Sequence, residues 1–354
     1  MLGVDLFSGA GGMSLGALQA GIDVVLAVEA DRHAAQTYYQ NHPDVDLFSD
    51  SIFKLDLVAL RKVARRRKEC VVFGGPPCQG FSYSNQRTRN SSNPSNWLFK
   101  EFIRIVKLVR AEWVVFENVK GITDTEGGKF LAAVLRDLDR LGYSLTSGLL
   151  NALDFGVPQN RQRLFVIGVL QGATIDLPSP SWSNPITVAE AISDLPYLEN
   201  GAAVSQMPYG LEAPSSYANR LREDARVSAN HLVTRNAENI VERYKHVPPG
   251  GNWSNVPSDL MANYKNLEGC HTGLYHRLQW DSPSVVIGNF RKNMLIHPNC
   301  NRGLSVREAA RIQSFPDKFA FSGSIGFQQQ QVGNAVPPLL AHAVFSKLVE
   351  SVES

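Results

Sequence analysis

The sequence predicts an α/β fold with a largely parallel sheet, followed by a second domain rich in loops. In the first half of the chain, short apolar runs alternate with amphipathic stretches, which is the pattern of βαβ units. The composition changes after Gly172, where prolines interrupt the chain repeatedly between residues 178 and 214. Periodicity fades from there until about residue 305, so the second domain is expected to hold few regular elements.

Each element is predicted from the spacing of its apolar residues. Strands are expected at residues 2–6, 24–28, 71–73, 113–116 and 164–169. Helices are expected at 13–20, 32–41, 55–67, 98–110 and 129–141, where apolar residues recur every three or four positions. Gly142 supplies a stop for the last of these helices. The helical pattern returns at 306–313 and 338–352, and we expect the final helix to pack back onto the sheet.

Composition excludes several classes of protein. A chain of 354 residues that is 44% hydrophobic can bury a sizeable core and is long enough for two domains. It contains neither a long apolar span nor a basic region followed by an apolar stretch at the N-terminus, so we expect no membrane segment and no secretory signal. The four cysteines are scattered without a C-x-x-C pair, which argues against a zinc site and disulfides and fits a reducing cytoplasm. A net charge of +2 permits nucleic-acid binding without implying it.

One cysteine follows an apolar run instead of lying within it. The run at residues 70–73 continues into Gly-Gly-Pro-Pro-Cys-Gln-Gly-Phe-Ser at 74–82. A structural cysteine normally packs inside such a run as a small hydrophobe. Cys78 lies beyond the expected strand end, where open α/β sheets place their chemistry. The stiff loop therefore presents Cys78 as a candidate nucleophile.

The first expected strand runs directly into the glycine-rich turn Asp-Leu-Phe-Ser-Gly-Ala-Gly-Gly at 5–12. Such a turn lets a ligand lie against bare backbone at a helix N-terminus. Glu29 follows the second strand, where an acidic side chain can bind ribose hydroxyls. Both dinucleotides and S-adenosylmethionine use this pattern, but the spacing departs from G-x-G-x-x-G and so disfavours a dehydrogenase.

Two further segments place charged residues beside expected strands. Glu117 follows the apolar run 114–116, at the same sheet edge as Cys78, where partial burial raises the pKa of a carboxyl group and suits it to proton donation. Arg161 and Arg163 are two residues apart in an extended segment, so both side chains are expected on one face, toward one acceptor-rich ligand. A helix cap or salt bridge for Glu117, and surface ion pairs for the arginines, are the simpler alternatives.

Taken in order, these motifs resemble the DNA (cytosine-5)-methyltransferases, in particular bacterial modification enzymes. The resemblance rests on residues 5–12, Glu29, 75–78, 117–119, 159–163 and 331–336, together with 304–316, so it spans nearly the whole chain. It implies a mixed, mostly parallel seven-stranded Rossmann-like methyltransferase sheet with a smaller, loop-rich target-recognition domain. The catalytic, S-adenosylmethionine-binding domain would comprise residues 1–171 and 331–354, and the target-recognition domain residues 172–330.

The resemblance also implies a mechanism. The Cys78 thiolate would add to C6 of a cytosine flipped out of double-stranded DNA. Glu117 would hold and protonate N3, Arg163 would bind the O2 side of the base and steady Cys78, and Arg161 would brace the site. The methyl group would pass from S-adenosylmethionine to C5, leaving S-adenosylhomocysteine.

By the same resemblance, a set of residues would line the cofactor pocket. Phe7 would stack on the adenine, Gly9 and Gly11 would line the methionine part, and Glu29 would bind the ribose. The others are Asp50, as acceptor from adenine N6, and Pro77, Leu98 and Asn334. Ala30 stands where the family often has an aromatic residue, and Asn93-Pro94-Ser95 replaces the family's Asp-x-Arg. Both departures put cofactor affinity in doubt more than activity.

Contacts with DNA are expected from the segment 79–96 and from the second domain. Gln79, Ser82, Arg87 and Arg89 would close over DNA and grip phosphates. Asn252 and Arg277 are candidate readers of base edges. The target sequence is not decoded by these residues.

Three alternatives and the question of partners stay open at this point. A tRNA-acting relative, a non-catalytic DNA-binding regulator that keeps the fold, and a nicotinamide-dependent oxidoreductase would share parts of the pattern. Restriction-modification enzymes and solitary methyltransferases share these motifs, so a cognate restriction endonuclease is an open partner and would not be a required subunit. We expect a cytoplasmic monomer with no metal.

Overall fold

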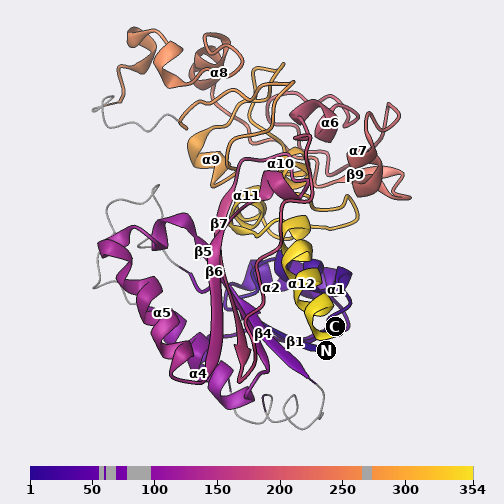
Figure 1. Cartoon of the computed structure of the whole chain (residues 1–354). Coiled ribbons are helices and arrows are strands. Elements are labelled where there is room, and N and C mark those ends of the chain that lie inside the picture. Colours follow the sequence, from indigo (N-terminus) through magenta and orange to yellow (C-terminus); the bar gives the residue numbers. More distant parts are fainter. Residues whose placement is uncertain (56–59, 61–68, 78–96, 265–272, 354) are drawn as a thin grey trace. The chain divides into compact units, whose positions relative to one another are not determined.

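A computed structural model describes residues 1–55, 60, 69–77, 97–264 and 273–353. The chain divides into two compact units (Figure 1). The first comprises Met1–Phe155, Gln162–Ser181 and Pro338–Ser354, and the second comprises Gly156–Arg161 and Trp182–Pro337. Within the described part of the chain, no helix has the length and apolar character needed to cross a bilayer.

The first unit is built on a seven-stranded sheet with the order β3-β2-β1-β4-β5-β7-β6. Its strands are β1 (Leu2–Leu6), β2 (Asp23–Val28), β3 (Asp46–Phe48), β4 (Cys70–Gly74), β5 (Trp113–Val119), β6 (Tyr143–Asn151) and β7 (Gln162–Leu170). Neighbouring strands are parallel from β3 to β5, whereas β7 is antiparallel to both β5 and β6. The predicted fold class, a mixed and mostly parallel seven-stranded sheet, is confirmed.

Helices cover both faces of this sheet. Phe102 of α4 (Phe99–Val109) meets Phe116 of β5 edge to face, and α5 (Lys129–Asp139) packs beside α4. Phe345 of α12 (Pro338–Glu353) meets Phe73 of β4, on the other face, and α1 (Gly12–Gln19) packs along α12. Figure 1 shows these two helix layers. The last helix therefore completes the first unit, as the sequence predicted.

Most predicted elements of the first half are present. The expected helix 32–41 coincides with α2 (Arg32–Asn41), where Asp31 accepts the backbone N–H groups of His33 and Ala34 as N-cap. Most of the expected helix 55–67 lies outside the described residues. Strands β3 and β6 were not predicted from the pattern, since β3 is only three residues long and β6 is mostly half-exposed with polar residues between its leucines.

The second unit contains short elements joined by long irregular segments. Its helices are α6 (Val188–Ile192), α7 (Ser216–Arg222), α8 (Glu238–Lys245), α9 (Phe290–Asn293), α10 (Val306–Ile312) and α11 (Ile325–Asn334). Its two strands, β8 (Gln206–Pro208) and β9 (Val227–Ala229), form a small antiparallel pair. Only α10 was predicted from the sequence among these elements.

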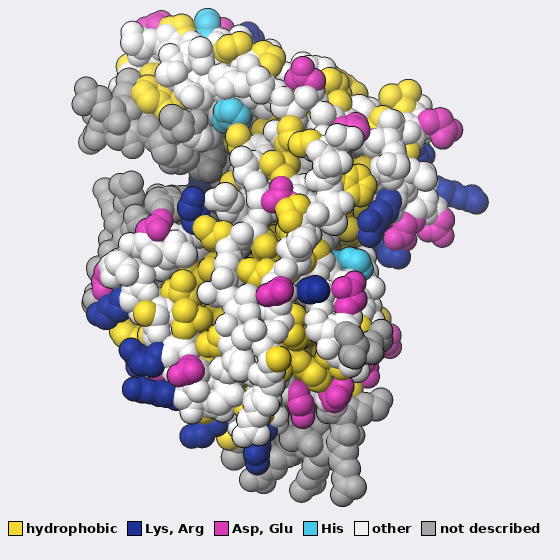
Figure 2. All heavy atoms as spheres, viewed as in Figure 1, with side chains coloured by type: hydrophobic (Ala, Val, Ile, Leu, Met, Phe, Trp, Pro, Cys, Tyr) yellow, Lys and Arg dark blue, Asp and Glu magenta, His cyan; other side chains and the backbone are white. Residues whose placement is uncertain are grey.

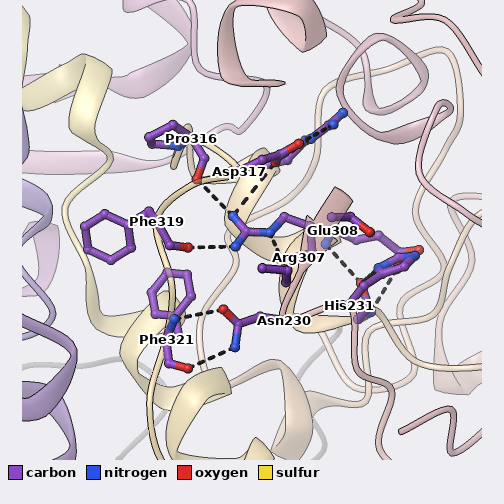
Figure 3. A network of polar contacts seen from close by, with 12 residues as sticks. Asn230, His231, Arg307, Glu308, Pro316, Asp317, Phe319 and Phe321 are labelled. Atoms are coloured by element: carbon purple, nitrogen blue, oxygen red, sulfur yellow. Dashed lines mark hydrogen bonds and ion pairs between the residues drawn. The ribbon is translucent and has the colours of Figure 1, made fainter. Parts of the chain in front are cut away.

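Buried arginines hold the irregular segments of the second unit together. Figure 3 shows Arg307, which donates to the carbonyl oxygens of Ala229, Pro316 and Phe319. Asn230 similarly exchanges two hydrogen bonds with the backbone of Phe321. A backbone without ladder partners must satisfy its polar groups in some other way, and here long side chains provide the donors.

The boundaries of the units differ from those expected at 171/172 and 330/331. Residues up to Ser181 stay with the first unit, because Ser181 N–H donates to Asp154 and Leu177 lies against Gly148 of β6. Helix α11 and the residues to Pro337 belong to the second unit, where α11 packs on α9 and α10. Gly156–Arg161 also joins the second unit.

Surface charge is mixed over the described part of the molecule. In the view of Figure 2, Lys and Arg side chains are interspersed with Asp and Glu. That distribution agrees with the net charge of +2.

Candidate active site

The loop that leads to Cys78 passes directly over Glu117. Strand β4 ends at Gly74, and a Cβ atom built on Gly75 would lie 2.5 Å from Glu117 Oε2. The neighbouring Asn118 donates from Nδ2 to the carbonyl oxygen of Pro76 at 3.2 Å. Glu117 and Asn118 thus contact the backbone at Gly75 and Pro76, and a side chain at position 75 would displace the Glu117 carboxyl group. Pro77 is the last described residue before Cys78. Cys78 itself lies outside the described residues.

Glu117 is paired with Arg163. The two residues are diagonal neighbours on β5 and β7, since Glu117 lies opposite Phe165 and Val119 lies opposite Arg163. Arg163 Nε is 3.0 Å from Glu117 Oε1, and both side chains are largely buried. The sheet therefore brings a carboxyl group and a guanidinium group together beside the loop that precedes Cys78.

Arg161 belongs to the second unit and is fully buried. It donates from Nη1 to the Ile287 carbonyl oxygen at 2.8 Å, and from Nη2 to those of Gly333 and Ala335, both at 2.9 Å. The carbonyls of Gly333 and Ala335 end helix α11, where a cation is favourable. Backbone carbonyls thus take the Nη donors of Arg161, and the shared face of Arg161 and Arg163 toward one ligand stays a prediction.

Two glutamines extend the contacts of Arg161. Gln159 accepts the N–H of Ile287 at 2.9 Å and donates to Gln313 Oε1 at 2.9 Å. Gln313 in turn donates to the Val332 carbonyl oxygen at 2.6 Å. These fully buried glutamines were not assigned a role from the sequence, although both fall inside motifs that carried the resemblance.

The glycine-rich turn after β1 has a form that suits a nucleoside ligand. Glu29 accepts the N–H of Gly9 on Oε2 and that of Asp31 on Oε1, each at 2.7 Å. Burial raises the pKa of Glu29, and these backbone hydrogen bonds partly oppose the rise. The space beside the Gly9 Cα is open to 4 Å. Buried Ser8 Oγ has no hydrogen-bond partner among the described residues, so a polar group of a ligand would fit there.

The remaining expected cofactor residues are spread over both units. Phe7 packs partly against the core of the first unit. Asp50 follows β3 and accepts from Ser51 N–H at 2.6 Å and Lys54 Nζ at 3.0 Å, and these bonds lower its pKa. Leu98 directly precedes α4, and Pro77 ends the described part of its loop. Asn334 is the last residue of α11 in the second unit.

Of the expected DNA contacts, Gln79, Ser82, Arg87 and Arg89 lie outside the described residues. Asn252 is half-buried and caps the short helical turn Trp253–Asn255, where its side chain accepts the Ser254 N–H.

Arg277 has a different place from the one expected. It is buried, and it donates to the carbonyl oxygens of Val247, Tyr244, His297 and Cys300 at 2.6 to 2.9 Å. Its assignment as a reader of base edges is corrected, because these carbonyls use its donors to hold the second unit together.

Comparisons with known proteins find relatives over nearly the whole chain. Residues 1–350 match the model of the family described as C-5 cytosine-specific DNA methylase. The chain is 39% identical over 343 residues to the Type II methyltransferase M1.HphI of Haemophilus parahaemolyticus, covering 96% of this chain and 84% of that protein. It is 34% identical over 368 residues to the Type II methyltransferase M.DdeI of Desulfomicrobium norvegicum, covering 98% and 88%.

Among solved structures, a putative DNA modification methyltransferase encoded within an Escherichia coli prophage superposes with a TM-score of 0.81 and 25% identity over the whole of both chains. The Dnmt2 methyltransferase of Schizosaccharomyces pombe superposes with a TM-score of 0.62 and 17% identity, covering 100% of this chain and 99% of that one. The second likeness supports the fold alone.

Proposed function

The chain belongs to the family of C-5 cytosine-specific DNA methylases, and on that premise we propose which of its residues carry out the reaction. The enzyme transfers a methyl group from S-adenosylmethionine to C5 of cytosine in DNA. Residue roles, target site and partners are the subject of the proposal. The observation that carries it is the Glu117–Arg163 pair, held against the loop whose next residue is Cys78.

Cys78 is the nucleophile of this proposal. Cytosine C5 is a poor nucleophile, so the aromaticity of the ring must be broken before C5 can accept a methyl group. The Cys78 thiolate forms a bond to C6, and the electron pair released in the ring is delivered toward C5. After methylation, loss of the C5 proton restores the C5–C6 double bond and breaks the bond to Cys78. The cationic Arg163 favours the thiolate over the thiol.

Glu117 protonates and holds N3 of the flipped cytosine, which lets the negative charge from the thiolate addition be accommodated. Its carboxyl group can do this because Arg163 and the loop backbone fix its position. Arg163 also faces the O2 side of the base. Arg161 and Gln159 act at a distance, by holding the backbone at 287 and at the end of α11.

The glycine turn is the proposed cofactor site. The cofactor supplies an electrophilic methyl group on a sulfonium. Glu29 and Ser8 offer oxygen atoms to ribose hydroxyls or the amino-acid part, the open side of Gly9 leaves room for the ligand, and Phe7 lies next to the turn. Asp50, Pro77 and Leu98 complete the proposed pocket in the first unit, and the role of Asn334 toward the cofactor rests on the family resemblance alone.

Bisulfite sequencing of a plasmid that expresses the protein tests the proposal directly. We expect protected cytosines in one short repeated context, and none with Cys78→Ala. Glu117→Gln should lower the rate by roughly 10²- to 10⁴-fold, as loss of a positioned general acid does. C5 methylation by soluble Cys78→Ala protein would contradict the covalent mechanism.

We also propose that the enzyme acts as a monomer on duplex DNA and protects it from an endonuclease that cuts the same site. The names of the bacterial relatives, Type II methyltransferases, support this role. Plasmid recovered from expressing cells should resist an endonuclease of the mapped specificity, whereas plasmid from Cys78→Ala cells should be cut. Sedimentation of the protein with and without duplex DNA gives the stoichiometry.

A further inference from the structure

A series of buried side chains contacts the glycine turn and the elements that flank it. Ser14 Oγ donates to Asp5 Oδ2 at 2.7 Å, which joins the end of β1 to the first turns of α1. The turn from Phe7 to Gly11 is the segment between these two residues. The hydrogen bond therefore closes the turn at its base, as a crosslink would.

Helix α2 extends this contact. Tyr38 Oη lies 2.7 Å from Ser14 Oγ, and Tyr38 is fully buried. Either hydroxyl can donate in this contact, and Ser14 contacts Asp5 at the same time. Asp5, Ser14 and Tyr38 thus form a connected series that links β1, α1 and α2.

His42, one turn further along α2, reaches the turn itself. Its ring packs on Tyr38 with centroids 4.6 Å apart, and its Nε2 lies 3.2 Å from the Gly11 carbonyl oxygen. A carbonyl oxygen only accepts, so Nε2 carries the proton. Gly11 has φ +97°, and a Cβ atom built there would lie 2.4 Å from His42 Nε2. The histidine ring therefore supports the bare backbone of Gly11.

The opposite end of the turn is held by Glu29 through the N–H of Gly9. The turn is thus fixed at Gly9 by a carboxylate and at Gly11 by an imidazole, with Asp5 and Ser14 closing its base. A prearranged backbone binds a ligand with less loss of conformational entropy than a mobile one.

The charge of Asp5 matters for this arrangement. Burial raises the pKa of Asp5 to about 8, with the nearby charge of Glu29 adding to the rise and the hydrogen bonds of Ser14 opposing it. Burial lowers the pKa of His42 to about 4. The negative charge of Asp31 also raises the pKa of Glu29. Burial raises the pKa of Tyr38 well above its ordinary value, so Tyr38 stays neutral. At pH 7 Asp5 is therefore mostly protonated, and its ionisation at higher pH would place a second negative charge near Glu29.

We propose that Asp5, Ser14, Tyr38 and His42 are positioning residues that hold the glycine turn in its cofactor-accepting form. This inference rests on the proposed cofactor site at Gly9, Gly11 and Glu29. It concerns residues that contact the turn and not the cofactor.

Calorimetric titration with S-adenosylhomocysteine tests it without reference to activity. Tyr38→Phe should weaken binding roughly tenfold, because it removes the hydrogen bond between Ser14 and α2. Tyr39→Phe is the matched control: the same change on the next residue of α2, whose side chain is 60% exposed and should leave affinity unchanged. Thermal unfolding of each variant separates loss of fold from loss of affinity.

The pH profile gives a second signature. Wild-type affinity should fall between pH 7 and pH 9, and Asp5→Asn, which cannot ionise, should bind well at pH 7 and lose this dependence. Because the ligand's own titration is common to both proteins, the difference between the two profiles reports Asp5.

Three results would overturn the inference. If Tyr38→Phe binds like wild type while its unfolding temperature drops, the network supports only stability. If Asp5→Asn and wild type share one pH profile, ionisation of Asp5 does not act on the turn. If folded wild-type protein binds no S-adenosylhomocysteine at any pH, the proposed cofactor site itself is wrong, which distinguishes that failure from the first two.

Discussion

The two units of this enzyme fill their interiors with different chemistry. The first unit has a sheet of apolar strands between apolar helix faces, and among its described residues no lysine or arginine is fully buried. The second unit buries a set of arginines, each at most 5% exposed: Arg161, Arg243, Arg277, Arg302, Arg307 and Arg311. Regular ladders satisfy the backbone in the first unit, whereas guanidinium groups satisfy many loop carbonyls in the second.

The difference teaches how an irregular domain can keep one structure. A guanidinium group has five donors in a fixed plane, so one arginine can bind several loops at once. Arg277, for example, holds carbonyl oxygens from both 244–247 and 297–300. The stability of the second unit should therefore depend strongly on single buried charges. The stability of the first unit should depend more on small changes in its apolar packing. Four predictions follow that difference from the largest effect to the smallest.

Arg311→Met should destabilise the second unit by about 3–5 kcal/mol, the effect of removing one partner from a buried ion pair. Arg311 binds Asp194 and Asp317, both with fully buried side chains. The variant would leave these carboxylates only the longer contacts with Arg222 at 3.7 Å and Arg307 at 3.8 Å. Thermal unfolding followed by amide exchange measures the loss.

Arg220→Met, an exposed arginine on α7, is the control and should change stability by less than about 0.5 kcal/mol. If both changes altered stability equally, the buried arginines would not be what stabilises the second unit.

Arg161→Lys and Arg163→Lys should separate stability from activity. Lysine at 161 cannot reach the three carbonyls that Arg161 holds, so about 2 kcal/mol of stability should be lost in the second unit. Lysine at 163 keeps a charge near Glu117, so stability should change little, whereas methylation should slow by roughly 10²-fold because Glu117 is less well positioned. Measured unfolding temperatures and single-turnover rates should therefore rank the variants in opposite orders.

Acid should weaken the second unit before the first. Burial lowers the pKa of His297 to about 4. Between pH 6.5 and 4 the unfolded state therefore binds a proton that the folded state does not bind, and the free energy of unfolding falls by about 2 kcal/mol by pH 5. Burial also lowers the pKa of His231. In the first unit His42 behaves alike, but the pKa of Asp5 is raised to about 8, so its folded form gains stability as pH falls from 8 toward 4.

Amide exchange at pH 7.5 and pH 5, corrected for intrinsic rates, tests this opposition. Protection should fall in the second unit and change little in the first. Below about pH 4.5 the second unit should lose more, since burial alone would raise the pKa of Glu308, yet Arg302 and His297 bring it well below its ordinary value, and protonation removes that stabilisation. If protection fell equally in both units at pH 5, the opposite pH dependence expected from His297 and Asp5 would be wrong.

The smallest effects should come from helix caps. Ser305→Ala should cost about 1–2 kcal/mol, because Ser305 caps α10 and also hydrogen-bonds His231 at 2.9 Å. Asp31→Ala removes only the cap of α2 and should cost about 1 kcal/mol. A double variant with His231→Phe should reduce the Ser305→Ala effect, and an unchanged effect would show that the cap alone matters.

The sequence predicted the first unit better than the second, for physical reasons. Apolar periodicity predicted α2 and β1 at their observed bounds. A helix that buries one face has an apolar residue at every third or fourth position, and a central strand is apolar throughout. The second unit has no such period. Arg277 was predicted to read base edges because the sequence around a loop arginine does not indicate whether its side chain faces solvent or binds backbone carbonyls. The carbonyl partners of Arg277 come from segments that are remote in sequence.

The candidate site divides in the same way. Glu117 and Arg163 lie on sheet strands, and the strand register accounts for their pairing. The contacts of Arg161 could not be predicted, since its partners at 287, 333 and 335 are remote in sequence. The sequence did not indicate the contacts of Asp5, Tyr38 and His42, because these contacts join separate elements of the fold. Asp5 in particular resembles any polar residue at the start of a turn.

Helix α12 has a consequence for how this protein is made. It follows the whole second unit in sequence, yet Phe345 packs on Phe73 and Ala341 lies against Gly16 in the first unit. On the ribosome, the strands of the sheet emerge while the helix that covers one of their faces has not yet been translated. The nascent chain therefore keeps an apolar sheet face open until the second unit has been synthesised. A chain released early would have its sheet but not its cover, and would be a substrate for chaperones and proteases instead of a methylating enzyme.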